Sequence, residues 1–132
     1  MKRIISYYHL FASLYYAKRN KAFQARMHLN DANRGIEGEI DFLPAYNARI
    51  RMMEGRHPEA RDCLNRIIQS VDDSEDVDAK YIYNFSKCNL ALYKKDESAQ
   101  YFKARALQLN ASQSVKIFLP FFSDAAISRI LD

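Results

Sequence analysis

One pattern of aromatic and alanine residues recurs three times along the chain and constrains its fold more than any other feature. The origins of the three copies are Ala25, Ala60 and Ala99, spaced by 35 and 39 residues. An aromatic residue stands both 18 and 14 residues before each alanine. The aromatic columns are Tyr7, Phe42 and Tyr81 at the first position and Phe11, Tyr46 and Phe85 at the second.

Each copy predicts a pair of α-helices joined by a short polar turn. Two rings four residues apart lie on one face of a helix. The chain has only three Gly and three Pro residues, which suits long helices better than a sheet of many strands. The turns lie at Asn20, Gly55 and Lys94, five residues before each alanine, and the longer second spacing places its extra residues in the acidic stretch 72–79. The expected helices cover residues 3–18, 21–34, 41–54, 58–70, 75–93 and 97–110.

The pattern resembles the tetratricopeptide repeat (TPR) family over residues 1–110. The period is close to the family's 34 residues, and Ala60-x3-Leu64 is similar to the family's Ala-x3-Phe. The chain departs from the family in having no Trp and in placing Lys103 at the large apolar position of copy three. The resemblance implies an all-α fold, namely an α-α superhelix of three helix pairs. The alternative is a compact helical bundle without repeats. It implies a single domain, 1–132, with repeats near 3–35, 40–71 and 75–110 and a C-terminal capping segment, 111–132.

In the resembling family, the first helices of the pairs line a concave groove that binds segments of partner proteins. The corresponding surface here is mostly apolar, and Arg49 and Asn84 are too few to form the clamp by which some members hold a terminal carboxylate. A shift of one residue in register would place the same side chains in the core. The predicted groove residues are Tyr7, Leu10, Leu14, Phe42, Arg49, Met52, Tyr81, Asn84 and Cys88.

Charge is distributed unevenly along the chain. Residues 1–35 contain seven Lys and Arg residues and a single acid, Asp31, whereas residues 72–99 contain seven acids and four bases. A basic end can meet phosphate groups or the acidic part of a second copy, although a solvated helix face is the plainer interpretation. The sequence contains no recognition-helix or RNA-binding signature, so a nucleic-acid partner is not expected.

The sequence lacks the common motifs of catalysis and of cofactor binding. Its glycines fit no phosphate-binding loop, and neither His-Glu-x-x-His nor Gly-x-Ser-x-Gly occurs. His28 and Cys63 share the position three residues after the alanine, but no third group orients them, and a packed column is the favoured interpretation. We therefore expect no enzymatic activity, no cofactor, and no catalytic or metal-binding residues.

The N-terminal segment and the cysteines favour a cytoplasmic location. The first twenty residues begin with basic residues and an apolar stretch, but His9 and four tyrosines interrupt it, and no small-residue cleavage site follows. No apolar run approaches the length of a membrane span, so no membrane association is expected. Cys63 and Cys88 suggest two small buried side chains in a reducing compartment.

The C-terminal segment carries more apolar surface than the cap of a repeat array needs. Residues 117–122 hold five large apolar side chains around Pro120, which bends or ends a helix. These side chains must be covered by the last repeat, by a second chain or by the groove itself.

The sequence as a whole predicts a non-catalytic protein–protein interaction module. Helical repeats of this kind form α-solenoid scaffolds that bind through a surface built by successive repeats. We expect a peptide or a helix as the partner, held in the apolar concave groove. The alternative is a self-associating structural module, a homodimer that uses exposed apolar helix faces.

Overall fold

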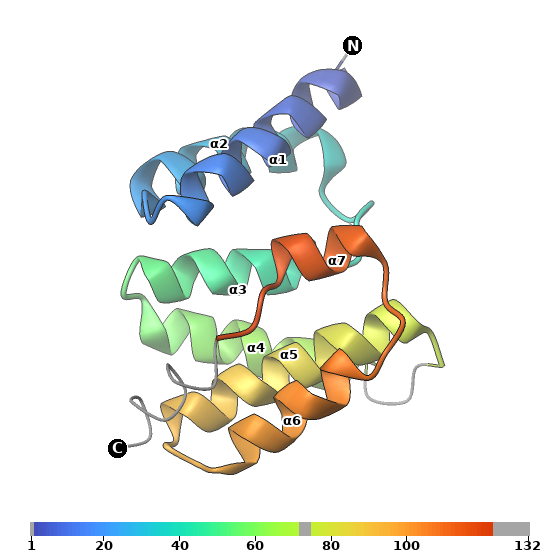
Figure 1. The fold of residues 1–132 in the computed structure, drawn as a ribbon. Coiled ribbons are helices and arrows are strands. Elements are labelled where there is room, and N and C mark those ends of the chain that lie inside the picture. The colour runs from blue at the N-terminus through green and yellow to red at the C-terminus, as the bar shows by residue number, and fades with distance from the viewer. Residues whose placement is uncertain (1, 72–74, 123–132) are drawn as a thin grey trace. The chain divides into compact units, whose positions relative to one another are not determined.

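The computed structural model describes residues 2–71 and 75–122, and all the regular structure within these ranges is helical (Figure 1). The prediction of an all-α chain is confirmed for this part of the molecule. Residues 72–74 of the predicted acidic connection and residues 123–132 of the predicted cap lie outside it. The helices are α1 (Lys2–Lys18), α2 (Ala22–Ile36), α3 (Leu43–Met53), α4 (His57–Val71), α5 (Val77–Tyr93), α6 (Ser98–Leu107) and α7 (Gln113–Phe118).

Helices α1 to α6 follow the six predicted ranges to within a few residues, and α7 has no counterpart among them. Two side-chain caps help to place the later helices. Asp76 begins α5 by accepting a hydrogen bond from the backbone N–H of Ala79 at 3.0 Å. Ser112 begins α7 in the same way, since its hydroxyl accepts from the backbone N–H of Val115 at 3.4 Å. The backbone N–H of Ser112 donates to the carboxylate of Asp78 at 2.8 Å, which ties the start of α7 to the first turn of α5.

The turn inside each helix pair contains one residue with a positive φ angle. These residues are Asn20, Gly55 and Lys95, with φ of 59°, 77° and 53°. The third turn lies one residue closer to its alanine than the other two. The backbone N–H of Ala99 donates to the carbonyl of Asp96, three residues earlier, whereas the other two alanines donate four residues back. Copy three therefore enters its second helix through a tighter first turn.

The chain divides into two compact units, one ending at Ala60 and the other beginning at Arg61, so that the boundary falls within α4. In the first unit, α1 packs against α2, and α2 contacts α3. In the second unit, α5 packs against α6 and contacts α7. Among the described residues, no helix is long and apolar enough to cross a membrane.

A buried hydrogen-bonded link joins the three helices of the first unit. The hydroxyl of Ser13 on α1 donates to the carbonyl of Ala25 on α2 at 2.8 Å. Since this uses the only proton of Ser13, the hydroxyl of Tyr46 on α3 donates to Ser13 Oγ, also at 2.8 Å. Ser13, Ala25 and Tyr46 are all fully buried, so every polar atom of the link has a partner.

An arginine that follows the opening alanine makes a similar contact in each unit. Arg26 forms a bidentate ion pair with Glu54, the C-cap of α3, with N–O distances of 2.9 and 3.2 Å. Arg61 lies over the ring of Tyr93, the last residue of α5, at 5.5 Å from its centroid. In both units, an arginine from the second helix of one pair contacts the end of the first helix of the next pair.

Candidate functional site

Most of the predicted groove residues have buried side chains. Tyr7, Arg49 and Met52 are partly exposed. The other members are buried, so they pack inside the protein and are not accessible to a partner. This is the core position in which a one-residue shift of register would place them. The buried members are Leu10, Leu14, Phe42, Tyr81, Asn84 and Cys88.

The two polar groove residues interact inside their own units. The side-chain amide of Asn84 donates to the carbonyl of Lys80, one turn earlier in α5, at 2.8 Å. The guanidinium of Arg49 lies 5.9 Å from the ring centroid of Tyr46, and burial lowers its pKa.

Helix α5 holds a segment of its own chain on the face where the groove residues were predicted. The hydroxyl of Tyr81 donates to the backbone carbonyl of Leu119 at 2.9 Å. The ring of Phe121 meets the rings of Tyr81 and Phe85 edge-on, with centroid distances of 5.4 and 5.7 Å. Phe121 also packs against the cluster that contains Cys88. We call this segment, residues 118–121, the strap. Of the predicted groove residues, Tyr81 contacts it directly and Cys88 belongs to the cluster on which it packs.

The strap leaves the helical conformation because of its sequence. Helix α7 ends at Phe118, and Pro120 disfavours helical geometry at the residue before it. Phe118 and Leu119 are buried, whereas Phe122 is exposed. The prediction that the apolar C-terminal segment covers a surface is therefore confirmed for the strap, which contacts Tyr81 and Phe85 of its own chain.

Burial keeps the two groove residues beneath the strap in their neutral forms. It raises the pKa of Tyr81 to about 12, so the hydroxyl retains at neutral pH the proton that it donates to Leu119. It raises the pKa of Cys88 to about 11, and nearby Lys103 opposes this shift only in part. Because the thiolate is the nucleophilic form of cysteine, Cys88 is a packing residue and a poor nucleophile.

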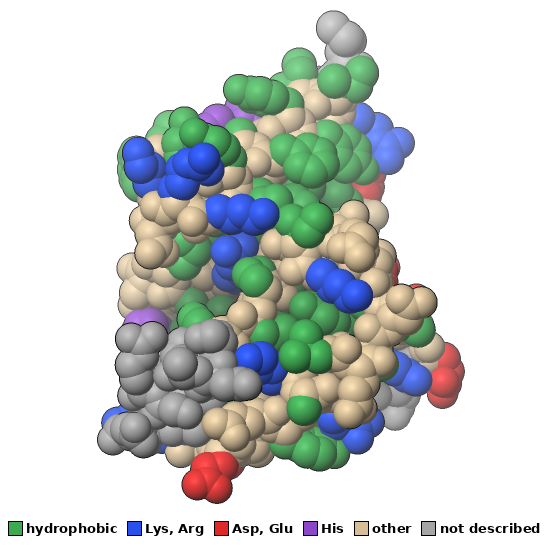
Figure 2. Space-filling view, viewed as in Figure 1, with side chains coloured by type: hydrophobic (Ala, Val, Ile, Leu, Met, Phe, Trp, Pro, Cys, Tyr) green, Lys and Arg blue, Asp and Glu red, His purple; other side chains and the backbone are tan. Residues whose placement is uncertain are grey.

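A second candidate surface lies on the outer side of α1. Ile4, Tyr8, Phe11 and Tyr15 are each more than half exposed, and they recur at intervals of four, three and four residues. Residues 4–17 contain no Lys, Arg, Asp or Glu, so α1 has no charged face along this length. Figure 2 shows hydrophobic side chains gathered over α1 and α2. We call these four exposed residues the α1 stripe.

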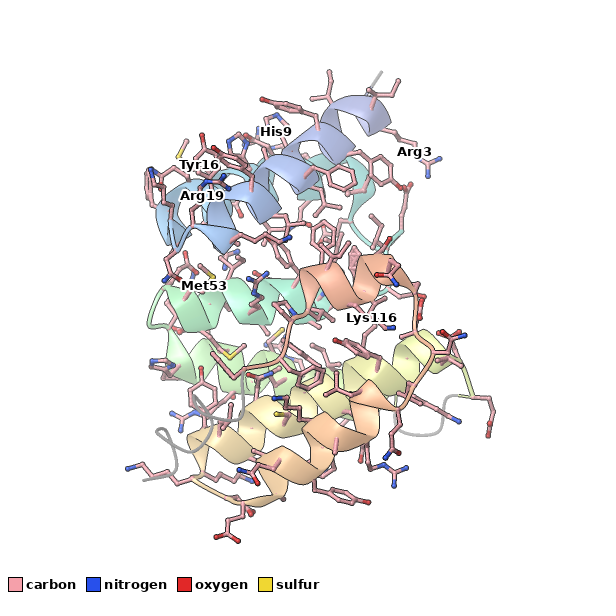
Figure 3. The ribbon with its side chains drawn as sticks, in the orientation of Figure 1. Arg3, His9, Tyr16, Arg19, Met53 and Lys116 are labelled. Carbon is pink, nitrogen blue, oxygen red and sulfur yellow. The ribbon has the colours of Figure 1, made fainter. Side chains whose placement is uncertain are left out.

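The α1 stripe ends at a basic turn. Lys18, Arg19 and Lys21 are exposed where α1 leads into α2. The guanidinium of Arg19 lies 3.6 Å from the ring centroid of Tyr15 and donates to its carbonyl at 3.3 Å. Figure 3 shows Arg19 on the first helix pair. On the adjoining start of α2, Phe23 is also largely exposed. The outer side of the first helix pair is therefore apolar along α1 and positively charged at one end.

A cluster of rings joins α1 to α2 beside this stripe. Nδ1 of His9 lies 2.9 Å from Nδ1 of His28, so one imidazole donates and the other accepts. His28 stacks on Tyr16 with an interplanar angle of 6°, and Asp31 lies 3.9 Å from His9. A cleft of about 410 Å³ adjoins His9 and Asp31. No group of three or more His, Cys, Asp and Glu side chains in the described ranges could hold a metal ion.

The sequence contained a signal for the α1 stripe. The spacing of four and three residues and the absence of charge over residues 4–17 are visible without a structure. An apolar helix face indicates that another surface packs on it, but not which surface. The repeat pattern assigned the apolar side chains of α1 only to a groove or to a core. Exposure of the stripe depends on which neighbours are present, and spacing does not specify them.

Comparison with known proteins adds no relative to this description. The chain matches no protein-family model, no curated protein and no solved structure. The description of the strap on α5 and of the α1 stripe with its basic turn therefore rests on the residues of this chain alone.

Proposed function

We propose that the chain is a non-catalytic protein-interaction module that holds an apolar peptide or helix on the first helices of its pairs. The observation that carries this proposal is the strap on α5. Tyr81 holds the backbone of Leu119 by a hydrogen bond, and two aromatic side chains hold Phe121. A hydrogen bond to the main chain combined with apolar pockets is a general way in which domains bind peptides.

We further propose that the helix pairs form a TPR-like superhelix with a C-terminal cap. The contacts of Arg26 and Arg61 support it, because both residues follow the opening alanine of a second helix and both reach the end of the next first helix. The link from Ser13 and Ala25 to Tyr46 supports it too, since a residue of the aromatic column is buried there by the preceding pair. Repeats that contact their neighbours in one recurring way are typical of solenoids.

The strap acts as a built-in competitor for the binding face of α5. A segment tethered by a short connection has an effective concentration in the millimolar range, so an external peptide must displace it. A labelled peptide of residues 113–122 is the matching probe, and its binding to the full chain is measured by fluorescence anisotropy. We expect Phe121→Ala to loosen the strap and to tighten binding of the probe about fivefold or more, because the tethered competitor is weakened.

The control for this experiment is Phe122→Ala. Phe122 is adjacent to Phe121 but exposed, so its replacement should leave binding of the probe as in the unmodified chain. Equal binding by the unmodified chain and both variants would contradict the proposal that α5 binds peptides.

Self-association is the second candidate function, and the exposed α1 stripe is the observation that favours it. Two chains that bury these apolar side chains against each other would form a dimer. Sedimentation velocity over a wide concentration range distinguishes the two functions. A stable dimer that dissociates on replacement of Tyr8 and Phe11 by serine would favour self-association.

A further inference from the structure

The α1 stripe occupies a position that is covered in the other helix pairs. Tyr46 and Phe85, which correspond to Phe11 in the repeat, are buried. Tyr46 is covered by α1 and α2, through its hydrogen bond to Ser13. Phe11, in contrast, is 60% exposed. The outer side of α1 is therefore the place where a preceding helix pair would pack, if the contact seen at Tyr46 recurred.

The spacing within the stripe indicates the shape of its partner. Intervals of four, three and four residues are those of the a and d positions of a helix that packs along another helix. From Ile4 to Tyr15 the stripe is about 16 Å long, at 1.5 Å per residue. A partner helix of about three turns matches this length and places its own apolar seam against the stripe.

The recurring arginine contact indicates the charge of the partner. At the end of α3 the residue that meets the preceding second helix is Glu54, and it binds Arg26. At the end of α1, the corresponding place is taken by Arg19, flanked by Lys18 and Lys21. A cationic turn is complemented by carboxylates, so the helix that packs here carries Asp or Glu where α2 carries Arg26.

We propose that the α1 stripe binds an amphipathic α-helix of another protein, whose apolar seam packs on α1 and whose acidic residues face Lys18, Arg19 and Lys21. The α1 stripe and the strap belong to different helices of the chain, and the proposal extends the function proposed above to a second partner. It is tested separately from peptide binding by α5, because its variants replace residues of α1 and of the turn that follows it, and because its probes are different peptides.

Charge disfavours a second copy of the stripe as the partner. An antiparallel pairing of two stripes would set Ile4 opposite Tyr15 of the other copy and the basic turn near Arg3. A parallel pairing would set the two basic turns side by side. Like charges meet in the parallel arrangement, which weakens association. In the antiparallel arrangement the basic turn meets Arg3 together with Glu39, its ion-pair partner, and this pair offers no excess of carboxylates to the turn.

The stripe also lacks the features of a surface for nucleic acid or lipid. A bound single strand needs cations along its length to contact successive phosphates, and residues 4–17 supply none. Helices that lie in a membrane surface carry Lys and Arg along their polar sides, and α1 carries them only near its ends.

Two synthetic helical peptides test the proposal on the full chain. Both carry leucine at the a and d positions of three heptads, and their flanking positions carry glutamate in one peptide and lysine in the other. We expect the acidic peptide to bind about tenfold more tightly than the basic one in fluorescence anisotropy. The double variant Tyr8→Ser/Phe11→Ser should weaken binding of the acidic peptide about tenfold or more. The variant Lys18→Glu/Lys21→Glu should abolish the preference for it.

The matched control is Tyr101→Ser/Leu107→Ser, which removes two exposed apolar side chains from α6 and should leave binding unchanged. Circular dichroism confirms that each variant keeps its helices. Equal binding of the two peptides, or equal losses in the α1 and α6 variants, would overturn the proposal. So would stripe-dependent binding to vesicles of phosphatidylcholine and phosphatidylserine, to an oligonucleotide or to a second copy of the chain, because each assigns the stripe to a different partner.

Discussion

Ser13 shows how one small residue holds three helices together. Its hydroxyl donates to Ala25 and accepts from Tyr46, so it satisfies two polar groups that have no access to water. Burial raises the pKa of Tyr46, so its hydroxyl remains a hydrogen-bond donor into the alkaline range. A buried hydrogen bond contributes about 1 kcal/mol to stability on average, and Ser13 takes part in two of them, which leads to a prediction.

Ser13→Ala should destabilise the protein more than Tyr46→Phe. The alanine removes both hydrogen bonds of the link at about 1 kcal/mol each, and we expect a loss of about 2 kcal/mol in the free energy of unfolding. The phenylalanine removes one donor, but Ser13 still donates to Ala25, so we expect a loss of about 1 kcal/mol. Urea unfolding measures both, and the opposite ranking would show that the link is wrongly assigned.

The buried Tyr81 and Cys88 predict a loss of stability at alkaline pH. Burial raises the pKa of Cys88 from 9.0 to about 11 and that of Tyr81 from 10.0 to about 12. Above pH 9 the unfolded chain releases these protons before the folded chain does. Their contribution to stability is thus fully present below pH 9 and is lost as the pH rises toward 12.

Urea midpoints across this pH range measure the loss. Cys88→Ala should make the decline shallower at its lower end, because the thiol titrates first. A midpoint that does not change between neutral pH and pH 11 would contradict the burial of these groups beneath the strap.

At the scale of elements, the three inter-helix turns differ in their chemistry although they share one geometry. Each places a residue in the left-handed region, and the residues are Asn20, Gly55 and Lys95. Glycine adopts this conformation without strain and asparagine tolerates it, whereas a lysine is strained there. The third turn is therefore the one that a single substitution can improve.

Lys95→Gly should stabilise the protein by about 0.5–1 kcal/mol, because the relief of left-handed strain exceeds the added entropy of the unfolded chain. Lys94→Gly is the matched control. Lys94 has helical angles, with φ of −87° and ψ of 0°, so the same change should give no gain there. Thermal unfolding of the two variants compares them, and a lower melting temperature for Lys95→Gly would contradict the turn geometry.

The sequence predicted the helices better than it predicted their surroundings. Phe11 and Tyr46 occupy the same position in the repeat, and both lie in helices, as predicted. Yet Tyr46 is buried and Phe11 is largely exposed, because burial depends on neighbours and spacing does not. The sequence predicted that the apolar side chains of the strap pack on some surface. It did not predict which surface, because the contact of the strap with Tyr81 joins residues that are far apart in the chain.

At the scale of the whole molecule, the function that we propose is binding. One unit presents the α1 stripe and its basic turn, and the other holds an apolar strap on α5. The strap is held by a main-chain hydrogen bond and by ring contacts that an external peptide could make equally well. Both surfaces are apolar with a few polar contacts, as expected for recognition of protein segments.

The most direct test of peptide binding by α5 is an NMR titration of the full chain, isotopically labelled and carrying Phe121→Ala, with the peptide of residues 113–122. Amide resonances of α5 from Tyr81 to Leu92 should shift on addition of the peptide, because these residues line the face that holds the strap. Resonances of α1 should not shift. Shifts confined to α1, or no shifts at all, would contradict the claim that α5 is a peptide-binding face.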